Sequence, residues 1–152
     1  MENTEKAFLL NISTQEKQFD ALYRGVASRF QMPDCTMWIL YFLICSDEAM
    51  TQQDLIEKMM FPKQTINSAV SGLVKKGLVE LKMIPGTRNR KRILLTDAGA
   101  RIAQDTVERM RSAEERAAAR LGSAKMEQYA KLYQEFFSAL QQEFRKEGLA
   151  DA

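Results

Sequence analysis

The sequence predicts a mainly α-helical fold with one small β-hairpin, and three observations lead to this prediction. Apolar residues recur at helical spacing over most of the 152 residues. Two short segments around residues 79–83 and 93–95 instead alternate apolar and polar residues, on either side of a basic turn. Directly before them, two helical segments are joined by a short connection. This order predicts a winged helix-turn-helix with long helices at both ends of the chain.

The first 45 residues are expected to form two helices. Apolar residues at helical spacing, with the spacing interrupted around Ser13-Thr14, predict a helix over about residues 5–30. Pro33 then breaks the chain, and Asp34 or Thr36 can cap the next helix, Met37 to Cys45. Because this second helix is apolar nearly all round, we expect it to run through the middle of the domain.

The next two helices make the helix-turn-helix. Thr51-Gln52-Gln53-Asp54 resembles a capping box, and it opens a helix that reaches Met60. Its apolar residues are expected to face inward: Leu55, Ile56, Met59 and Met60. A helix follows over about residues 62–76, with an apolar stripe at helical spacing formed by Ile66, Ala69, Val70, Leu73 and Val74. Two lysines and Gly77 then end it, as helix C-termini favour.

The C-terminal third is predicted to be helical after the hairpin. Thr96-Asp97 caps a long helix over about residues 97–120, and Gly122-Ser123 breaks the chain. The last helix, about 124–146, has a broad apolar stripe rich in aromatic residues. Such a surplus, which the N-terminal helix shares, favours a dimer interface. Packing of the two terminal helices on each other would explain the same surface.

Positive charge is concentrated in the helix-turn-helix and the hairpin. Residues 61–101 hold nine basic and two acidic side chains, whereas the whole chain has a net charge of only +2. A compact basic segment in an otherwise acidic protein suits a polyanion, because neutralising phosphates releases counterions and strengthens binding. A lysine-rich surface exposed to solvent is the ordinary alternative. The excess falls on the elements that would meet DNA, which favours the polyanion.

The outer face of the second helix of this pair carries polar residues and no acidic one. These residues are Lys63, Gln64, Thr65, Asn67, Ser68 and Ser71. Amide and hydroxyl side chains can hydrogen-bond to base edges in the major groove, whereas an ordinary solvent-facing helix surface usually carries Glu. The hairpin turn has four basic side chains: Arg88, Arg90, Lys91 and Arg92. They would repel one another without a polyanion, so we expect the helix and the hairpin to bind duplex DNA.

Composition argues against an enzyme. Without histidine, the chain has no Ser-His-Asp or Cys-His arrangement and no histidine metal site, and two cysteines are too few for a four-thiolate zinc site. It has no glycine-rich phosphate loop, so no cofactor is expected. The acidic N-terminus indicates no signal peptide, and the longest apolar run is too short for a membrane span. We therefore expect a single cytoplasmic domain, with no catalytic residue, metal or membrane partner.

Three segments in their order and spacing resemble the MarR family of transcriptional regulators. They are TQQDL at the start of one helix, KQTINSAVSGLVKKGLV in the next, and LLTDAG after the hairpin. The resemblance covers essentially the whole chain, residues 1–152. It implies a winged-helix part over about residues 34–100, with dimerisation helices over about 5–30 and 101–146.

The resemblance also implies a function. It suggests an intertwined homodimer that binds a pseudo-palindromic operator in double-stranded DNA, usually as a repressor, and releases it when a small aromatic compound binds. The six polar residues of the recognition helix would face the major groove, and the two helices of a dimer would enter grooves about one helical turn apart. Arg88 would be the wing arginine. Thr51 and Gln52 would lie near phosphate. Thr87 and Asn89 stand where many members carry Asp and Arg, which is a departure from the family pattern.

The effector and its site are less clearly marked. Trp38, Tyr41 and Phe42 can line an aromatic pocket with residues of the first helix, although core packing explains them equally well. Cys35 lies near a helix start, where the helix dipole can lower a thiol pKa, so a redox-sensing regulator is one alternative. The other possibility is that Cys35 is an unreactive cysteine packed in the core. A winged-helix module that binds protein is a further alternative, but it would favour an acidic or apolar recognition face.

Overall fold

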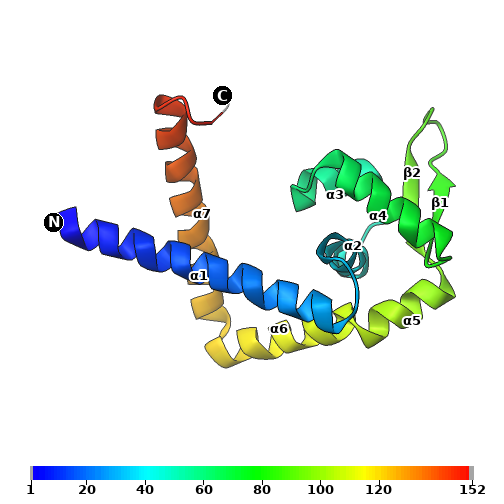
Figure 1. Ribbon diagram of the computed structural model, residues 1–152, viewed down its shortest axis with the longest axis horizontal. Helices are drawn as coiled ribbons and strands as arrows, with labels where there is room; N and C mark the ends of the chain where they lie inside the picture. The colour runs from blue at the N-terminus through cyan, green and yellow to red at the C-terminus, as the bar shows by residue number, and fades with distance from the viewer. Residues whose placement is uncertain (1, 151–152) are drawn as a thin grey trace. The chain divides into compact units, whose positions relative to one another are not determined.

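The computed structural model describes residues 2–150 and divides the chain into two compact units, one ending at Arg111 and one beginning at Ser112 (Figure 1). The first unit holds α1 (Glu2–Arg29), α2 (Asp34–Cys45), α3 (Gln52–Met59), α4 (Lys63–Lys75), β1 (Val79–Met83), β2 (Lys91–Leu95), α5 (Asp97–Asp105) and the start of α6 (Val107–Leu121). The second unit holds the rest of α6 and α7 (Ser123–Lys146). The predicted class, mainly α with a small hairpin, is confirmed. Within residues 2–150, no helix is both long and apolar enough to cross a membrane.

Helix α2 forms the centre of the first unit. It contacts α1, α3, α4, α5 and β2, and its residues Met37, Ile39 and Leu40 are almost fully buried. Leu55 of α3 and Ile66 of α4 pack into the same core. The central position expected from its all-round apolar sequence is confirmed, and α2 therefore holds the helix-turn-helix against the start of the C-terminal helices.

One detail of the first two helices was predicted wrongly. Helix α2 begins at Asp34 with Pro33 at the N-cap, and no side chain caps it, so neither Asp34 nor Thr36 has that role. Proline suits this position because its ring presets the backbone φ angle. Helix α1 is continuous through Ser13-Thr14, where the apolar spacing of the sequence is interrupted. The Thr14 hydroxyl donates to the Leu10 carbonyl at 2.8 Å, which keeps this polar side chain on the helix.

The start of α3 forms as predicted, but its end does not. Thr51 accepts from the backbone N–H of Asp54, and the Asp54 carboxylate accepts from the backbone N–H of Thr51, which makes a capping box. At the other end, Met60 adopts the left-handed conformation with φ 55° and is 84% exposed. The inward position expected for Met60 is wrong, because the left-handed turn that ends the helix directs this side chain to solvent.

The long helix expected over residues 97–120 is two helices. Thr106 separates α5 from α6, with φ −122° and ψ −90°, and its hydroxyl donates to the Ile102 carbonyl at 2.6 Å. A threonine side chain that bonds back to the preceding turn competes with the backbone ladder and bends helices. Helical periodicity continues across Thr106, so the sequence pattern does not reveal this break.

The long helices expose many large apolar side chains in the single chain. In α7 these are Tyr129, Leu132, Tyr133, Phe136, Phe137 and Phe144, and in α1 they are Phe8, Leu9, Leu10, Phe19 and Leu22. Large exposed apolar patches are uncommon on monomeric soluble proteins. Both helices therefore present surfaces suited to burial against another chain.

Candidate nucleic-acid interface

Helix α4 presents the predicted polar face to solvent. Ile66, Val70 and Leu73 are buried and fix the rotation of the helix about its axis. The six residues expected to face DNA are all exposed on the outer side: Lys63, Gln64, Thr65, Asn67, Ser68 and Ser71. This face has hydrogen-bond donors and acceptors, one positive charge and no acidic side chain. It therefore has the chemistry needed to contact base edges and phosphates.

Helix α3 contacts this face through one amide pair. Gln52 in the first turn of α3 donates from Nε2 to Oδ1 of Asn67 at 3.2 Å. The bond occupies one acceptor site of Asn67 and leaves its amide N–H groups available. Gln52 therefore orients an exposed side chain of α4. The expected approach of phosphate to this helix start stays a prediction.

Thr51 cannot present its hydroxyl to a phosphate. The residue is only 6% exposed, and its hydroxyl donates to Asp54 Oδ2 at 2.8 Å while accepting from the Asp54 backbone N–H. The side-chain contact expected for Thr51 is therefore wrong. Thr51 instead stabilises the helix start, where backbone N–H groups of the first turn have no intrahelical partners and suit an anion.

The wing is an antiparallel hairpin with a well-defined turn. Its register pairs Val79 with Leu95 at the base and Met83 with Lys91 near the tip. Gly86 has φ 78°, as the third residue of a type II turn after Pro85 requires. The Thr87 backbone N–H and hydroxyl both donate to the Ile84 carbonyl, at 3.2 and 2.7 Å. Thr87 thus holds the turn, at one of the two positions where the sequence departs from the pattern that the family resemblance implies.

The four basic residues of the wing, Arg88, Arg90, Lys91 and Arg92, are all exposed. Within residues 2–150, none of them forms an ion pair. Concentrated positive charge that no ion pair neutralises, on a projecting hairpin, suits a phosphate backbone. Figure 1 shows the hairpin extending past α4.

The wing is attached to the helix-turn-helix at its base. The backbone N–H of Ile93 donates to the Met50 carbonyl at 2.8 Å, and Thr51 forms a β-bridge with Arg92. Hydrogen bonds from the Thr51 backbone and side chain lower the pKa of Asp54, and the positive charges of Arg90 and Lys58 lower it further. The start of α3 and the wing are therefore coupled both by backbone hydrogen bonds and by charge.

Thr96 and Gly99 join the wing to α5. The Thr96 hydroxyl donates to the Gly77 carbonyl at 2.7 Å and accepts from the Gly99 backbone N–H at 3.0 Å. A Cβ atom at Gly99 would lie 1.8 Å from the carbonyl oxygen of Leu78. Only glycine allows α5 to approach the backbone at Leu78, just before β1, so closely. Thr96 and Gly99 therefore both help to set the position of the wing on the core.

The aromatic residues expected to line an effector pocket pack on one another. The ring centroids of Trp38 and Tyr41 are 5.4 Å apart, and those of Trp38 and Tyr23 are 4.9 Å apart. Phe42 completes this aromatic cluster. None of Trp38, Tyr41 and Phe42 lines the groove described next, and an effector pocket at these three residues stays a prediction.

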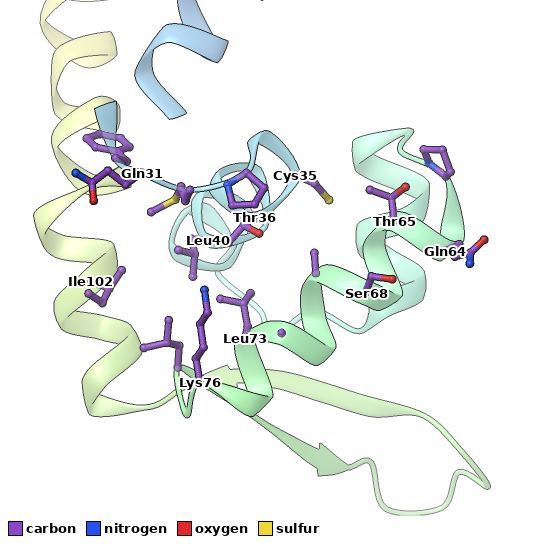
Figure 2. Close-up of a pocket in the computed structure, with 17 residues that line it drawn as sticks. Gln31, Cys35, Thr36, Leu40, Gln64, Thr65, Ser68, Leu73, Lys76 and Ile102 are labelled. Carbon is purple, nitrogen blue, oxygen red and sulfur yellow. The ribbon is translucent and has the colours of Figure 1, made fainter. Parts of the chain in front are cut away.

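A groove of about 830 Å³ lies on the opposite side of α2. Figure 2 shows its walls, which include Gln64, Thr65 and Ser68 from α4 and Cys35, Thr36 and Leu40 from α2. Sequence reasoning missed this groove because its walls come from segments far apart in the chain.

The environment of Cys35 bears on redox sensing. Burial raises the pKa of the Cys35 thiol most, and the neighbouring Asp34 carboxylate raises it further. Both effects oppose the thiolate on which redox sensing depends.

Comparisons with known proteins agree with this geometry. Residues 30–88 match the model of the MarR family. A MarR family regulator from Neisseria meningitidis has a TM-score of 0.78 and 18% identity, covering 90% of this chain and 96% of that chain. The S. aureus MepR–DNA complex has a TM-score of 0.60 and 18% identity, and the match covers 88% of this chain and 96% of that chain. The transcription regulator MarR from Oenococcus oeni PSU-1 has a TM-score of 0.66 and 15% identity, and the match covers 84% of this chain and 96% of that chain. No curated protein matches the sequence.

Proposed function

We propose that this chain is a sequence-specific DNA-binding transcriptional regulator of the MarR family, which the match of residues 30–88 to the family model and the likeness of the fold support. In this proposal it acts in the cytoplasm as a homodimeric repressor, which a small-molecule effector releases from a pseudo-palindromic operator. It acts by binding and not by catalysis.

One observation carries the DNA-binding proposal. The exposed face of α4 has no acidic side chain, and beside it the wing has four exposed basic side chains without an ion pair in the described part of the chain. A protein-binding winged helix needs neither feature, whereas a helix in the major groove and a hairpin on the backbone need both. The fold of MepR, which was solved as a DNA complex, supports the same use.

The exposed apolar faces of α1 and α7 support the homodimer. A two-fold symmetric dimer would bury these faces and present two copies of α4 to successive major grooves. A dimer also explains why α7, which has no buried residue in the single chain, carries so many aromatic side chains. The mass of the purified protein in solution tests this part directly, since a monomer at micromolar concentration would contradict it.

The experiment for DNA binding uses the full-length protein and the DNA upstream of its own gene. Binding to this DNA and to a scrambled duplex is measured at about 50 and 200 mM salt, concentrations over which a protein with several phosphate contacts loses affinity by orders of magnitude. We expect tight, salt-sensitive and sequence-selective binding. Equal binding to both duplexes would contradict an operator in this DNA. Failure to bind any duplex at low salt would overturn the proposal and favour a protein-binding module.

A further inference from the structure

Among the six polar residues on the exposed face of α4, Asn67 alone has a side chain with a fixed partner. In the part of the chain that the structure describes, the side chains of the other five form no hydrogen bond or ion pair. Hydroxyl and amide groups that are free to turn can present either a donor or an acceptor to a base. Asn67 is therefore the residue for which the structure indicates what kind of base edge it can bind.

Asn67 is well placed to reach base edges. It is exposed and lies in the first half of α4, and in helix-turn-helix proteins the N-terminal residues of the second helix contact the bases. Ile66 and Val70, which flank it on the inner side of the helix, are buried and hold this part of α4 against the core. Both the backbone and the side chain of Asn67 are thus restrained before DNA binds.

The hydrogen bond from Gln52 turns the oxygen of the Asn67 amide toward α3. Gln52 donates from Nε2 to Oδ1 of Asn67 at 3.2 Å. Because the oxygen and nitrogen of a planar amide lie on opposite sides, this bond directs the Asn67 nitrogen away from α3. The start of α3 favours the same direction, since its N–H groups without intrahelical partners carry partial positive charge and attract an oxygen. Asn67 therefore presents mainly its two N–H donors.

Two N–H donors suit the edge of guanine better than that of any other base. In the major groove guanine has two neighbouring acceptors, N7 and O6, whereas adenine has one acceptor beside the N6 donor, and cytosine offers the N4 donor. The common pairing of asparagine with adenine uses the side-chain oxygen as the acceptor. In this protein Gln52 holds that oxygen, which favours guanine.

We propose that Gln52 is a positioning residue that sets the base preference of Asn67, and that the preferred base is guanine. This inference rests on the proposed DNA-binding function and adds to it the identity of one base pair in each half of the operator. It also assigns part of the sequence specificity to α3, although the base contact itself comes from α4.

Gln52→Glu tests the direction of the hydrogen bond. A carboxylate at this position accepts but cannot donate, so the Asn67 amide should turn, donate from Nδ2 to the carboxylate and present Oδ1 to DNA. This oxygen accepts from N6 of adenine or N4 of cytosine. The variant should therefore prefer one of these bases over guanine by about fivefold or more, which is the smaller end of the discrimination that a good base contact provides.

The measurement uses the full-length protein in two steps. Selection of bound duplexes from a random-sequence pool gives the preferred operator, and the same selection with Asn67→Ala identifies the base pair at which preference is lost. The wild type and Gln52→Glu are then titrated with four duplexes that differ only at this base pair in both half-sites. The wild type should prefer a G·C pair in one orientation. Gln52→Glu should prefer an A·T pair or the reversed G·C pair.

Three further variants separate this role from a general effect on structure or charge. Gln53→Glu adds the same charge at the next residue of α3, where the side chain contacts Glu57, and should keep the wild-type preference. Gln52→Met, similar in size but without an amide, should lose the preference for guanine without gaining another. Gln52→Glu combined with Asn67→Ala should bind the four duplexes as Asn67→Ala does, because Gln52 acts through Asn67.

Three results would overturn this inference while leaving the proposed function intact. These are a wild-type preference for an A·T pair at the position that Asn67 reads, the same preferred base pair in Gln52→Glu as in the wild type, or a switch by Gln52→Glu that persists in the Asn67→Ala background. A wild-type protein that binds no duplex at low salt would instead refute the proposed function, and this inference with it.

Discussion

Gln52 Nε2 lies 3.2 Å from Asn67 Oδ1, so a hydrogen bond joins the first turn of α3 to the exposed face of α4. The bond restrains a side chain that otherwise projects into solvent, and restraint before binding reduces the entropy lost on binding. It also selects which part of the Asn67 amide faces outward. A residue at the start of one helix thereby influences what the next helix can recognise.

Asn67→Ala should relax base preference at one operator position, at a cost of about 1–3 kcal/mol for the preferred base pair. Gln52→Ala should reduce the preference at the same position by less, because Asn67 remains but is no longer restrained. Binding to operators with each base pair substituted in turn measures both effects. Gln53→Ala is the control, since Gln53 bonds to Glu57 on α3. Loss of preference at unrelated positions would contradict the role of Gln52.

Arg88→Ala combined with Arg90→Ala should weaken binding to all duplexes to a similar extent. Removing one phosphate-binding side chain reduces the slope of log affinity against log salt by about 1, so the double substitution should reduce it by about 2. Titrations at several salt concentrations measure this change. Arg116→Ala with Arg120→Ala removes the same charge from exposed positions of α6 and should leave the slope unaltered. An unchanged slope in the wing variant would contradict its binding to phosphates.

Gly99→Ala should destabilise the protein by at least about 2 kcal/mol, because the new Cβ would lie 1.8 Å from the Leu78 carbonyl oxygen. Relief of this clash requires α5 to move away from the base of the wing. Urea unfolding measures the loss of stability, with Gly25→Ala as a control that should retain or increase stability. A Gly99→Ala protein as stable as the wild type would show that α5 does not approach the Leu78 backbone so closely.

Asp54→Asn should cost about 1 kcal/mol of stability at neutral pH, because it weakens the capping box at α3. Folding lowers the pKa of Asp54, so its stabilising effect is present above the unfolded pKa of about 3.9 and disappears as the pH falls through the lower folded value. Unfolding of both proteins from neutral to strongly acidic pH should therefore show a difference that shrinks in acid. Asp47→Asn, at an exposed site between α2 and α3, should show little difference at any pH. A constant difference for Asp54→Asn would exclude this titration.

Cys35 should react with thiol reagents more slowly than Cys45, since Cys35 is 6% exposed and its pKa is raised, whereas Cys45 is exposed. Reaction of the Cys45→Ser and Cys35→Ser proteins with an aromatic disulfide at neutral pH measures the two thiols separately. Rapid oxidation of Cys35 by peroxide, accompanied by loss of DNA binding, would revive the redox-sensing alternative.

Local sequence patterns were sufficient to predict the helix-turn-helix and the hairpin. The apolar spacing of Ile66, Val70 and Leu73 determines which side of α4 is buried, and therefore which residues are exposed. The capping box from Thr51 to Asp54 and the glycine turn at Gly86 likewise depend on residues close together in the chain. Such features follow from short-range physics, so one sequence reveals them.

Tertiary contacts determined which other parts of the chain these helices and the hairpin contact. The sequence shows that Thr51 is suited to cap a helix, but only the bridge to Arg92 shows that the residue is covered by the wing. It likewise places Lys76 near the end of α4, yet the groove that this lysine enters exists because α2 and α5 pack beside α4. The periodicity of a helix reveals which residues share a face, whereas the partner of that face depends on contacts between segments distant in the chain. For this reason the sequence alone predicted the polar face of α4, and only the fold revealed the groove beside it.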